Sequence, residues 1–173
     1  IVNINYTIIG KLWPVIYFID VLLLGLVLTT SKINGVSGWF QFLDRTFQPS
    51  ELVKIGFILT FSKHLSVLKG RGLLERPLHV VLLGFHALIP VAVMFQLQGD
   101  AGSAAIFFCM FLAMSFGAGV QLRYFIGLFA AIGVAFPFVW RYLLDDYQRD
   151  RFTIFLHPES DPTGKGLQQL QGK

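Results

Sequence analysis

An acid and a base stand three residues apart in the segment 48–54, which reads Gln-Pro-Ser-Glu-Leu-Val-Lys. Proline suits the first turn of a helix, where its missing N–H would have had no partner, so we expect a helix to begin at Gln48 or Pro49. Glu51 and Lys54 then share one helix face, where they can pair, and charged groups in an apolar segment are functional candidates by default. Alternatively, the helix dipole favours the acid and the lysine reaches towards water. Spacing alone favours this structural interpretation.

Asp100 is the second candidate, in the run Gln98-Gly99-Asp100-Ala101-Gly102-Ser103. An aspartate at this place is typical of a helix N-cap, whose side chain accepts an N–H of the following turn and contributes about 1 kcal/mol. The same carboxylate would also face any ligand at that helix end. Without further context, the cap alone is the favoured interpretation.

Three further polar residues lie inside apolar segments. Asp20 is expected to face a helix bundle, in a hydrogen-bonded structural role or a transport or proton role. His79 and His86 are seven residues apart on one helix face, which suggests packing or an interhelical hydrogen bond. No carboxylate lies at ligand spacing from them, so no protein-held metal site is predicted.

The composition indicates what kind of elements carry these residues. The chain is 54% hydrophobic and 14% charged, with a mean hydropathy of +0.64. Between Arg76 and Arg141 only Asp100 and Arg123 are charged. A soluble protein would need polar faces that this stretch lacks. The net charge of +4 forms no basic stripe, so a nucleic-acid partner is not expected. Cys109 is the single cysteine, which excludes a disulfide framework within this chain.

Five segments are long enough to cross a hydrocarbon core of about 30 Å as helices. The sequence therefore predicts an all-α polytopic membrane protein, with residues 1–144 forming the transmembrane portion and residues 145–173 a polar tail. The predicted spans cover residues 12–31, 49–65, 77–96, 101–119 and 122–144.

The short loops predict the orientation of these spans. The connection between the second and third spans carries Lys63, Lys69, Arg71 and Arg76 against Glu75, the strongest basic excess in the chain. The positive-inside rule places this loop in the cytoplasm. The loop at 32–48, the turn around Asp100 and the polar tail then lie outside, and Arg123 falls in a cytoplasmic turn.

Several spaced motifs together resemble the SEDS family of membrane proteins, and most closely its RodA branch. They occur in the family's order from about Trp13 to Gln171, and any one of them alone would be weak. The motifs are Trp39, Gln48-Pro49-Ser50-Glu51 with Lys54, Gln98-x-Asp100-x-Gly102-Ser103, Asp146-Tyr147-Gln148-Arg149-x-Arg151, and Leu156-x-Pro158-Glu159-Ser160-Asp161-Pro162-x-Gly164-x-Gly166.

The resemblance implies a ten-helix peptidoglycan glycosyltransferase of cell elongation in the bacterial cytoplasmic (inner) membrane. Such an enzyme polymerises lipid II, is surrounded by membrane lipids and works with a class B penicillin-binding protein. The five spans would correspond to the family's third to seventh helices, and residues 145–173 would begin its large extracytoplasmic loop. The chain starts at Ile1 without a methionine, so we expect it to be a piece of a longer protein.

The resemblance also implies site residues. Asp100 would be a required outer-face carboxylate, which positions substrate, binds a cation or assists proton transfer. A divalent cation is therefore a conceivable cofactor. Lys54 would neutralise pyrophosphate or order Glu51. The acid usually proposed as the family's catalytic base would fall beyond Lys173, so the fragment alone is expected to be inactive. The substrate-binding candidates are Trp39, Gln48, Glu51, Lys54, Gln98, Arg149 and Arg151.

Two other functions stay open at this point. One is a flippase for lipid-linked precursors, which needs a continuous polar path across the bilayer. The other is a noncatalytic scaffold that recruits a penicillin-binding protein. The chain also departs from the family at Gly38, Thr46 and Gly99, where an arginine, a basic residue and a proline are usual.

Overall fold

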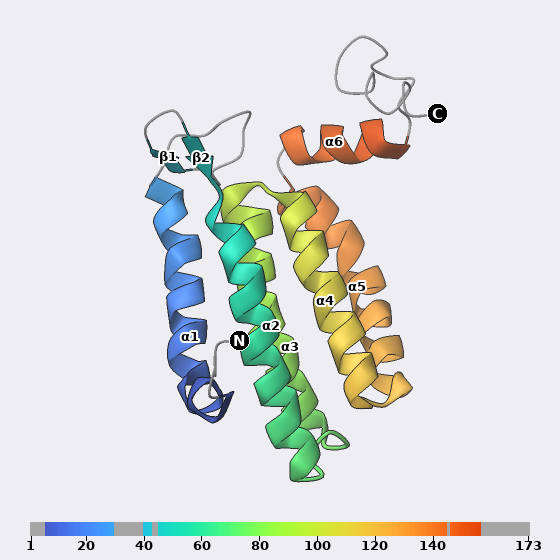
Figure 1. The fold of residues 1–173 in the computed structure, drawn as a ribbon. Coiled ribbons are helices and arrows are strands. Elements are labelled where there is room, and N and C mark those ends of the chain that lie inside the picture. Colours follow the sequence, from blue (N-terminus) through green and yellow to red (C-terminus); the bar gives the residue numbers. More distant parts are fainter. Residues whose placement is uncertain (1–5, 30–39, 43–44, 145, 157–173) are drawn as a thin grey trace, which may run out of the picture. The chain divides into compact units, whose positions relative to one another are not determined.

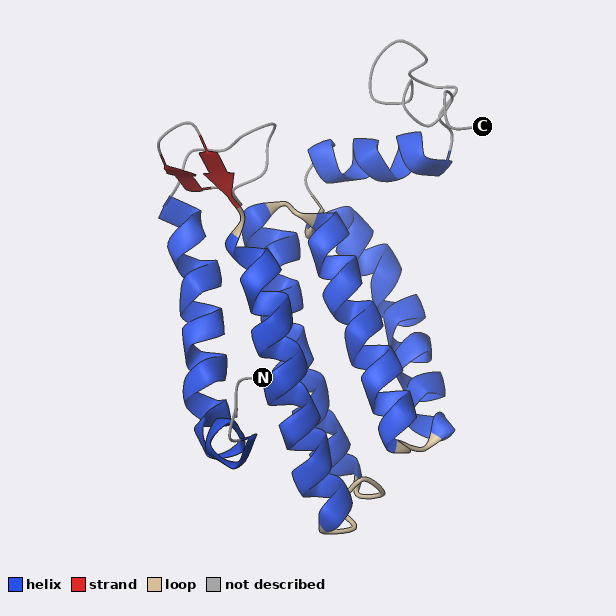
Figure 2. Ribbon diagram, viewed as in Figure 1, coloured by secondary structure: helices blue, strands red, loops and turns tan. Residues whose placement is uncertain are grey.

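The computed structural model describes residues 6–29, 40–42, 45–144 and 146–156. The described residues are helical apart from one short hairpin and the connecting turns (Figures 1 and 2). The chain divides into two compact units, Ile1–Tyr124 and Phe125–Lys173. We call them the first and second units.

α2 (Pro49–Gly70) is the central helix of the first unit and packs against α1 (Tyr6–Leu26), α3 (Pro77–Ala92) and α4 (Ala101–Ala118). As predicted, Pro49 occupies its first turn and Gln48 precedes it in an extended conformation. Fully buried aromatic rings form the core around this helix. Phe57 lies 5.2 Å from both Phe61 and Phe107, measured between ring centroids.

Helices α1 and α3 each continue into a short helical segment with a different hydrogen-bonding pattern. α1 continues into a 3-10 turn, η1 (Val27–Thr29), and α3 into a π-helical segment, η2 (Val93–Gln98). Gly99 follows η2 with a φ of 73°, in the left-handed region that favours glycine. This turn brings the chain directly to the start of α4.

A two-stranded antiparallel hairpin stands just before α2. β1 (Phe40–Phe42) pairs with β2 (Arg45–Phe47), with Phe40 opposite Phe47. The sequence predicted only a loop at 32–48, so this hairpin is an addition. Figure 1 shows it at the end of the first unit where α2 begins.

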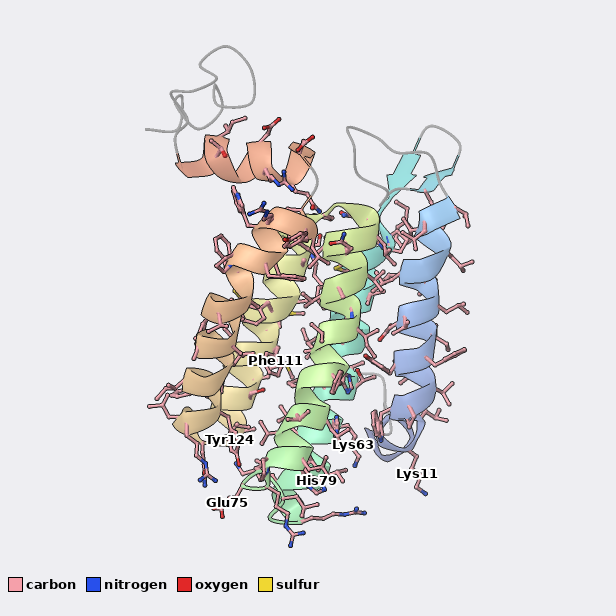
Figure 3. The ribbon with its side chains drawn as sticks, turned by 180° about the vertical axis from the view of Figure 1, so that it is seen from behind. Lys11, Lys63, Glu75, His79, Phe111 and Tyr124 are labelled. Atoms are coloured by element: carbon pink, nitrogen blue, oxygen red, sulfur yellow. The ribbon has the colours of Figure 1, made fainter. Side chains whose placement is uncertain are left out.

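The opposite end of the first unit carries the basic connection between α2 and α3. The backbone carbonyl of Glu75 accepts hydrogen bonds from the Tyr124 hydroxyl at 2.6 Å and from Arg123 at 3.3 Å. Figure 3 shows Glu75, Tyr124, His79 and Lys63 towards this end. Arg123 therefore lies beside the 63–76 connection, at the end where the predicted orientation places it.

Within the described residues, four helical stretches are long and apolar enough to cross a membrane, namely Gly10–Thr29, Pro77–Gln98, Ala101–Ala118 and Leu122–Tyr142. α2 is not among them, although it has 22 residues, because it carries charges near both ends. Large apolar side chains are exposed along all of these helices, as expected for contact with lipid or further helices. The predicted fold class, a helical multi-span membrane segment, is confirmed.

The second unit contains most of α5 (Leu122–Tyr142) and all of α6 (Asp146–Leu156). α5 ends two residues before the predicted span does, and the polar tail begins as a helix. The guanidinium of Arg149 on α6 donates to the carbonyls of Trp140 and Arg141 at the C-terminal end of α5, at 3.1 and 3.2 Å. It also pairs with Asp146 at 3.3 Å. Arg149 thus joins the two helices by satisfying terminal carbonyls.

Candidate functional site

A polar cluster occupies the end of the first unit where α2 and α4 begin. We call it the Asp100 cluster, and it consists of Gln48, Gln98, Asp100 and Ser103. Gln48 directly precedes α2, Gln98 ends η2, and Asp100 is the N-cap of α4. Two helix starts and one helix end therefore supply its side chains.

Among the described residues, Ser103 and Gln48 donate three hydrogen bonds to the Asp100 carboxylate. Its Oδ1 accepts from the Ser103 backbone N–H at 3.0 Å, which confirms the predicted N-cap. Its Oδ2 accepts from the Ser103 hydroxyl at 2.7 Å and from the Gln48 amide nitrogen at 3.1 Å. The last bond joins residues 52 positions apart and ties the start of α4 to the start of α2. The carboxylate is half-buried, so it is held in one orientation while part of it stays accessible.

Gln98 lies beneath this carboxylate and points into the unit. Its side chain is 2% exposed, and its amide nitrogen donates to the Leu24 carbonyl at the end of α1, at 2.9 Å. The backbone N–H of Asp100 bonds to the Met94 carbonyl at 2.9 Å, which closes the turn. Gln98 is therefore placed to position the turn that carries Asp100, and a direct substrate contact would need it to leave Leu24.

Glu51 and Lys54 form an ion pair on the first two turns of α2. The Lys54 ammonium lies 2.6 Å from Glu51 Oε1, which confirms that the two share a helix face. The Lys54 side chain is 20% exposed and that of Glu51 is 59% exposed. The lysine is thus the more enclosed partner, and an exposed pair of this kind contributes at most about 1 kcal/mol. A positive charge held near a helix start can offset negative charge on a bound phosphate.

The remaining predicted site residues lie elsewhere or outside the described residues. Trp39 is outside them, as are residues 157–173 with most of the last motif. The backbone of Arg151 lies in α6, but its side chain is not described. Arg149 belongs to the second unit, where its guanidinium bonds to α5 carbonyls and to Asp146. An anionic ligand would compete with these bonds.

The donor set around Asp100 limits how a divalent cation could be held. Within the part of the chain that the structure describes, no group of three or more His, Cys, Asp or Glu residues is arranged to hold a metal ion. Asp100 would be the single carboxylate ligand from this cluster, and substrate phosphates would have to complete the shell. Magnesium is commonly bound in this way, so the residues fit such an ion only together with substrate.

Ser103 and the contact between Gln48 and Asp100 were not predicted as parts of the site. The spacing Asp100-x-x-Ser103 is a local signal for the first, since a cap accepts from the third residue of its helix. The second depends on how α2 and α4 pack, and no local pattern encodes that.

The whole chain is similar in sequence to a family of known proteins. The family model for the cell cycle proteins FtsW, RodA and SpoVE matches residues 1–173. The peptidoglycan glycosyltransferase MrdB of Escherichia coli K12 is 32% identical over 168 residues, which cover 92% of this chain and 42% of that protein. A probable peptidoglycan glycosyltransferase FtsW of Trichlorobacter lovleyi is also 32% identical, over 167 residues that cover 93% and 42%. These equal identities do not separate the RodA and FtsW branches.

Two solved structures are similar as well. A chain of a peptidoglycan synthase complex, in which polymerization and crosslinking are coordinated, superposes with a TM-score of 0.78 at 33% identity. The match covers 98% of this chain and 49% of that one. The rod shape determining protein RodA of Thermus thermophilus gives a TM-score of 0.59 at 33% identity, covering 70% and 40%. The chain spans about two fifths of the length of the curated relatives it matches.

Proposed function

Because this chain belongs to the SEDS family of cell cycle proteins, which comprises FtsW, RodA and SpoVE, we propose that it is part of a peptidoglycan glycosyltransferase. The substrate is lipid II, and the products are a lengthened glycan strand and a polyprenyl pyrophosphate. Relatives that are themselves peptidoglycan glycosyltransferases support this proposal over nine tenths of the chain. Within the family we propose the elongation role of the RodA branch, on the motifs quoted above.

The observation that carries the proposal is the Asp100 carboxylate, which Gln48 and Ser103 hold in one orientation. In the reaction, the acceptor sugar hydroxyl loses its proton and attacks the anomeric carbon of the donor. A new C–O bond forms there as the bond to pyrophosphate breaks. We assign to Asp100 the orientation of the acceptor hydroxyl or of a cation on the pyrophosphate, and to Lys54 the offset of pyrophosphate charge. By family resemblance, the general base is an acid later in the loop that α6 begins.

The surroundings follow from the same proposal. The protein crosses the bacterial cytoplasmic membrane, with the Asp100 cluster at its outer end and the 63–76 connection in the cytoplasm. A class B penicillin-binding protein is the proposed partner, and the similar chain from a synthase complex supports this. Residues 145–173 begin the extracytoplasmic loop, and the surrounding lipids contact the exposed apolar helix faces.

The first prediction tests the role of Asp100 in the full-length protein. Asp100→Asn keeps the size of the side chain and removes its charge, so we expect lipid II polymerisation to fall about hundredfold. The measurement is the rate of glycan strand formation by purified protein in the presence of its penicillin-binding partner.

Glu75→Gln is the matched control, because Glu75 lies at the opposite end of the first unit, where its backbone carbonyl accepts hydrogen bonds from Arg123 and Tyr124. This control should retain polymerisation within about twofold of the unchanged protein. Polymerisation by Asp100→Asn at the control rate would contradict the assignment. Normal elongation of cells that carry both Asp100→Asn and Lys54→Ala would favour the scaffold, and lipid II transport without polymerisation would favour the flippase.

A further inference from the structure

A second polar cluster lies inside the first unit, apart from the Asp100 cluster. We call it the histidine cluster, and it consists of Tyr17 and Asp20 on α1, Thr60 and His64 on α2, and His86 on α3. Asp20, Thr60 and His86 are buried, with exposed fractions of 7%, 0% and 6%. These residues lie within helices of the membrane segment, where polar groups without a protein partner are strongly disfavoured.

Asp20 faces α2 at a glycine. A Cβ atom on Gly56 would collide with the Asp20 carboxylate, so this carboxylate occupies the space beside the α2 backbone that the glycine leaves free. Gly56, Thr60 and His64 are spaced by four residues and therefore share one face of α2. Asp20 Oδ2 is fully buried and has no hydrogen-bond partner among the described residues. An ionised carboxylate in this position would be uncompensated.

The two imidazoles form a directed chain of hydrogen bonds with Thr60. The Thr60 hydroxyl donates to the Phe57 carbonyl, so its oxygen is free to accept from His86 Nε2 at 3.3 Å. His86 Nε2 then carries the proton, and His86 Nδ1 offers a lone pair. His64 Nδ1 lies 3.2 Å from that atom and must donate to it. Both histidines are neutral in this arrangement, and each tautomer is determined by its neighbour.

Aromatic side chains enclose this pair. Trp13 stacks on His64 and His86, with ring centroids 5.4 and 6.0 Å away. The Tyr17 ring lies 4.1 Å from the His86 ring, measured between centroids, and the Tyr17 hydroxyl donates to the His86 carbonyl at 2.7 Å.

A single proton between the two Nδ1 atoms allows the histidine pair to be neutral or singly charged. Two charged imidazoles would place N–H groups against each other, so the double cation is excluded.

Among the described residues, few charged or titratable groups lie on the helices around Asp20. Helix α1 carries Tyr17, one turn from Asp20, and α2 carries His64, two turns beyond Gly56. Helix α3 carries His79 and His86. The Nδ1 atom of His79 is buried without a partner among the described residues. Lys63 approaches Gly10, about 15 Å along α1 from Asp20. Neither ion pair found among the described residues, Glu51–Lys54 or Asp146–Arg149, includes Asp20. A proton is therefore the ligand that fits this carboxylate.

We propose that Asp20 is a proton-binding site inside the membrane segment, protonated while α1 packs on α2. Release of the proton to solvent leaves a bare carboxylate against Gly56 and weakens the contact between α1 and α2.

The test uses the full-length protein in lipid nanodiscs and reads protonation directly by infrared spectroscopy. We expect a carbonyl band from a protonated carboxylic acid at neutral pH, which Asp20→Asn removes. Asp146→Asn is the control, because that side chain is 96% exposed and paired with Arg149, and the band should remain. An identical band in the unchanged protein and in Asp20→Asn would overturn the proposal.

A measurement on the unchanged protein keeps the test decisive if Asp20→Asn fails to fold. Carbon-13 NMR of labelled aspartate should show one carboxyl that stays protonated at neutral pH, and fully ionised aspartates would overturn the proposal. Nitrogen-15 NMR of labelled histidine should show His64 protonated at Nδ1 and His86 at Nε2. Two histidines without a bond between their Nδ1 atoms would overturn the assigned tautomers. The Asp100 cluster shares no residue with this one, so neither result bears on the proposed glycosyltransferase activity.

Discussion

Asp100 both caps α4 and accepts hydrogen bonds from side chains, so a single substitution at Asp100 cannot separate its structural role from its role in the reaction. Oδ1 caps α4 through the Ser103 N–H, while Oδ2 accepts the Ser103 hydroxyl and the Gln48 amide. Asp100→Asn therefore changes the cap and the charge together. Substitution of Ser103 separates the two effects, because its backbone N–H still donates to Asp100 Oδ1 when its hydroxyl is removed.

Ser103→Ala is the second prediction. The variant loses one hydrogen bond to a charged group, which contributes about 1.5 kcal/mol, so we expect polymerisation to fall about tenfold with little loss of folded protein. The readouts are the rate of lipid II polymerisation and the thermal unfolding temperature. Ser62→Ala is the control, since the Ser62 hydroxyl bonds to Leu59 within its own helix. Equal rates for the two variants would show that the hydroxyl does not orient Asp100.

At the scale of elements, the turn between η2 and α4 determines where Asp100 lies. Gly99 adopts a φ of 73° and its N–H bonds to the Met94 carbonyl, while Gln98 ties the same turn to the Leu24 carbonyl. Proline, the family's usual residue before this aspartate, has a φ near −65° and no N–H. This chain therefore reaches the cap through a conformation that a proline could not adopt.

Substitution of Gly99 is the third prediction. Gly99→Ala places a side chain in the left-handed region and should destabilise the folded protein by about 1 kcal/mol; Gly99→Pro should destabilise it more because it also loses the bond to Met94. Thermal unfolding of the full-length protein in detergent measures both effects. Gly102→Ala is the control, because its Cβ would meet Asp100 Oδ1 at an ordinary contact distance of 3.6 Å. Stability of Gly99→Pro equal to that of this control would mean that the turn has another conformation.

At the scale of the whole molecule, the two ends of the first unit differ in chemistry. One end carries the Asp100 cluster and the β1–β2 hairpin, and the other carries the basic 63–76 connection with Glu75, Arg123 and Tyr124 (Figures 1 and 3). Because both α2 and the α3–η2 stretch run between these ends, the proposed orientation applies to the unit as a whole.

The fourth prediction concerns that orientation. In a background in which Cys109 and any cysteine outside this chain are replaced by serine, Phe47→Cys should react with a membrane-impermeant maleimide in intact spheroplasts, and Arg71→Cys only after the membrane is opened. Labelling is measured by gel shift, with the background protein as the unlabelled control. The reverse pattern would place the Asp100 cluster in the cytoplasm and contradict a role on the outer-face substrate.

By itself, the sequence determined the membrane class, the start of α2 at Pro49, the Glu51–Lys54 pair and the Asp100 cap. These features depend on local rules, because hydropathy, proline geometry, helix spacing and capping act over a few neighbouring residues. Only the tertiary structure decided that Gln48 bonds to Asp100, that Gln98 turns inward to Leu24, and that Arg149 bonds to α5. It likewise decided that Asp20 lies at Gly56 and that His64 meets His86. Such contacts join distant residues through helix packing, and that packing depends on complementary surfaces that no single segment of the sequence contains.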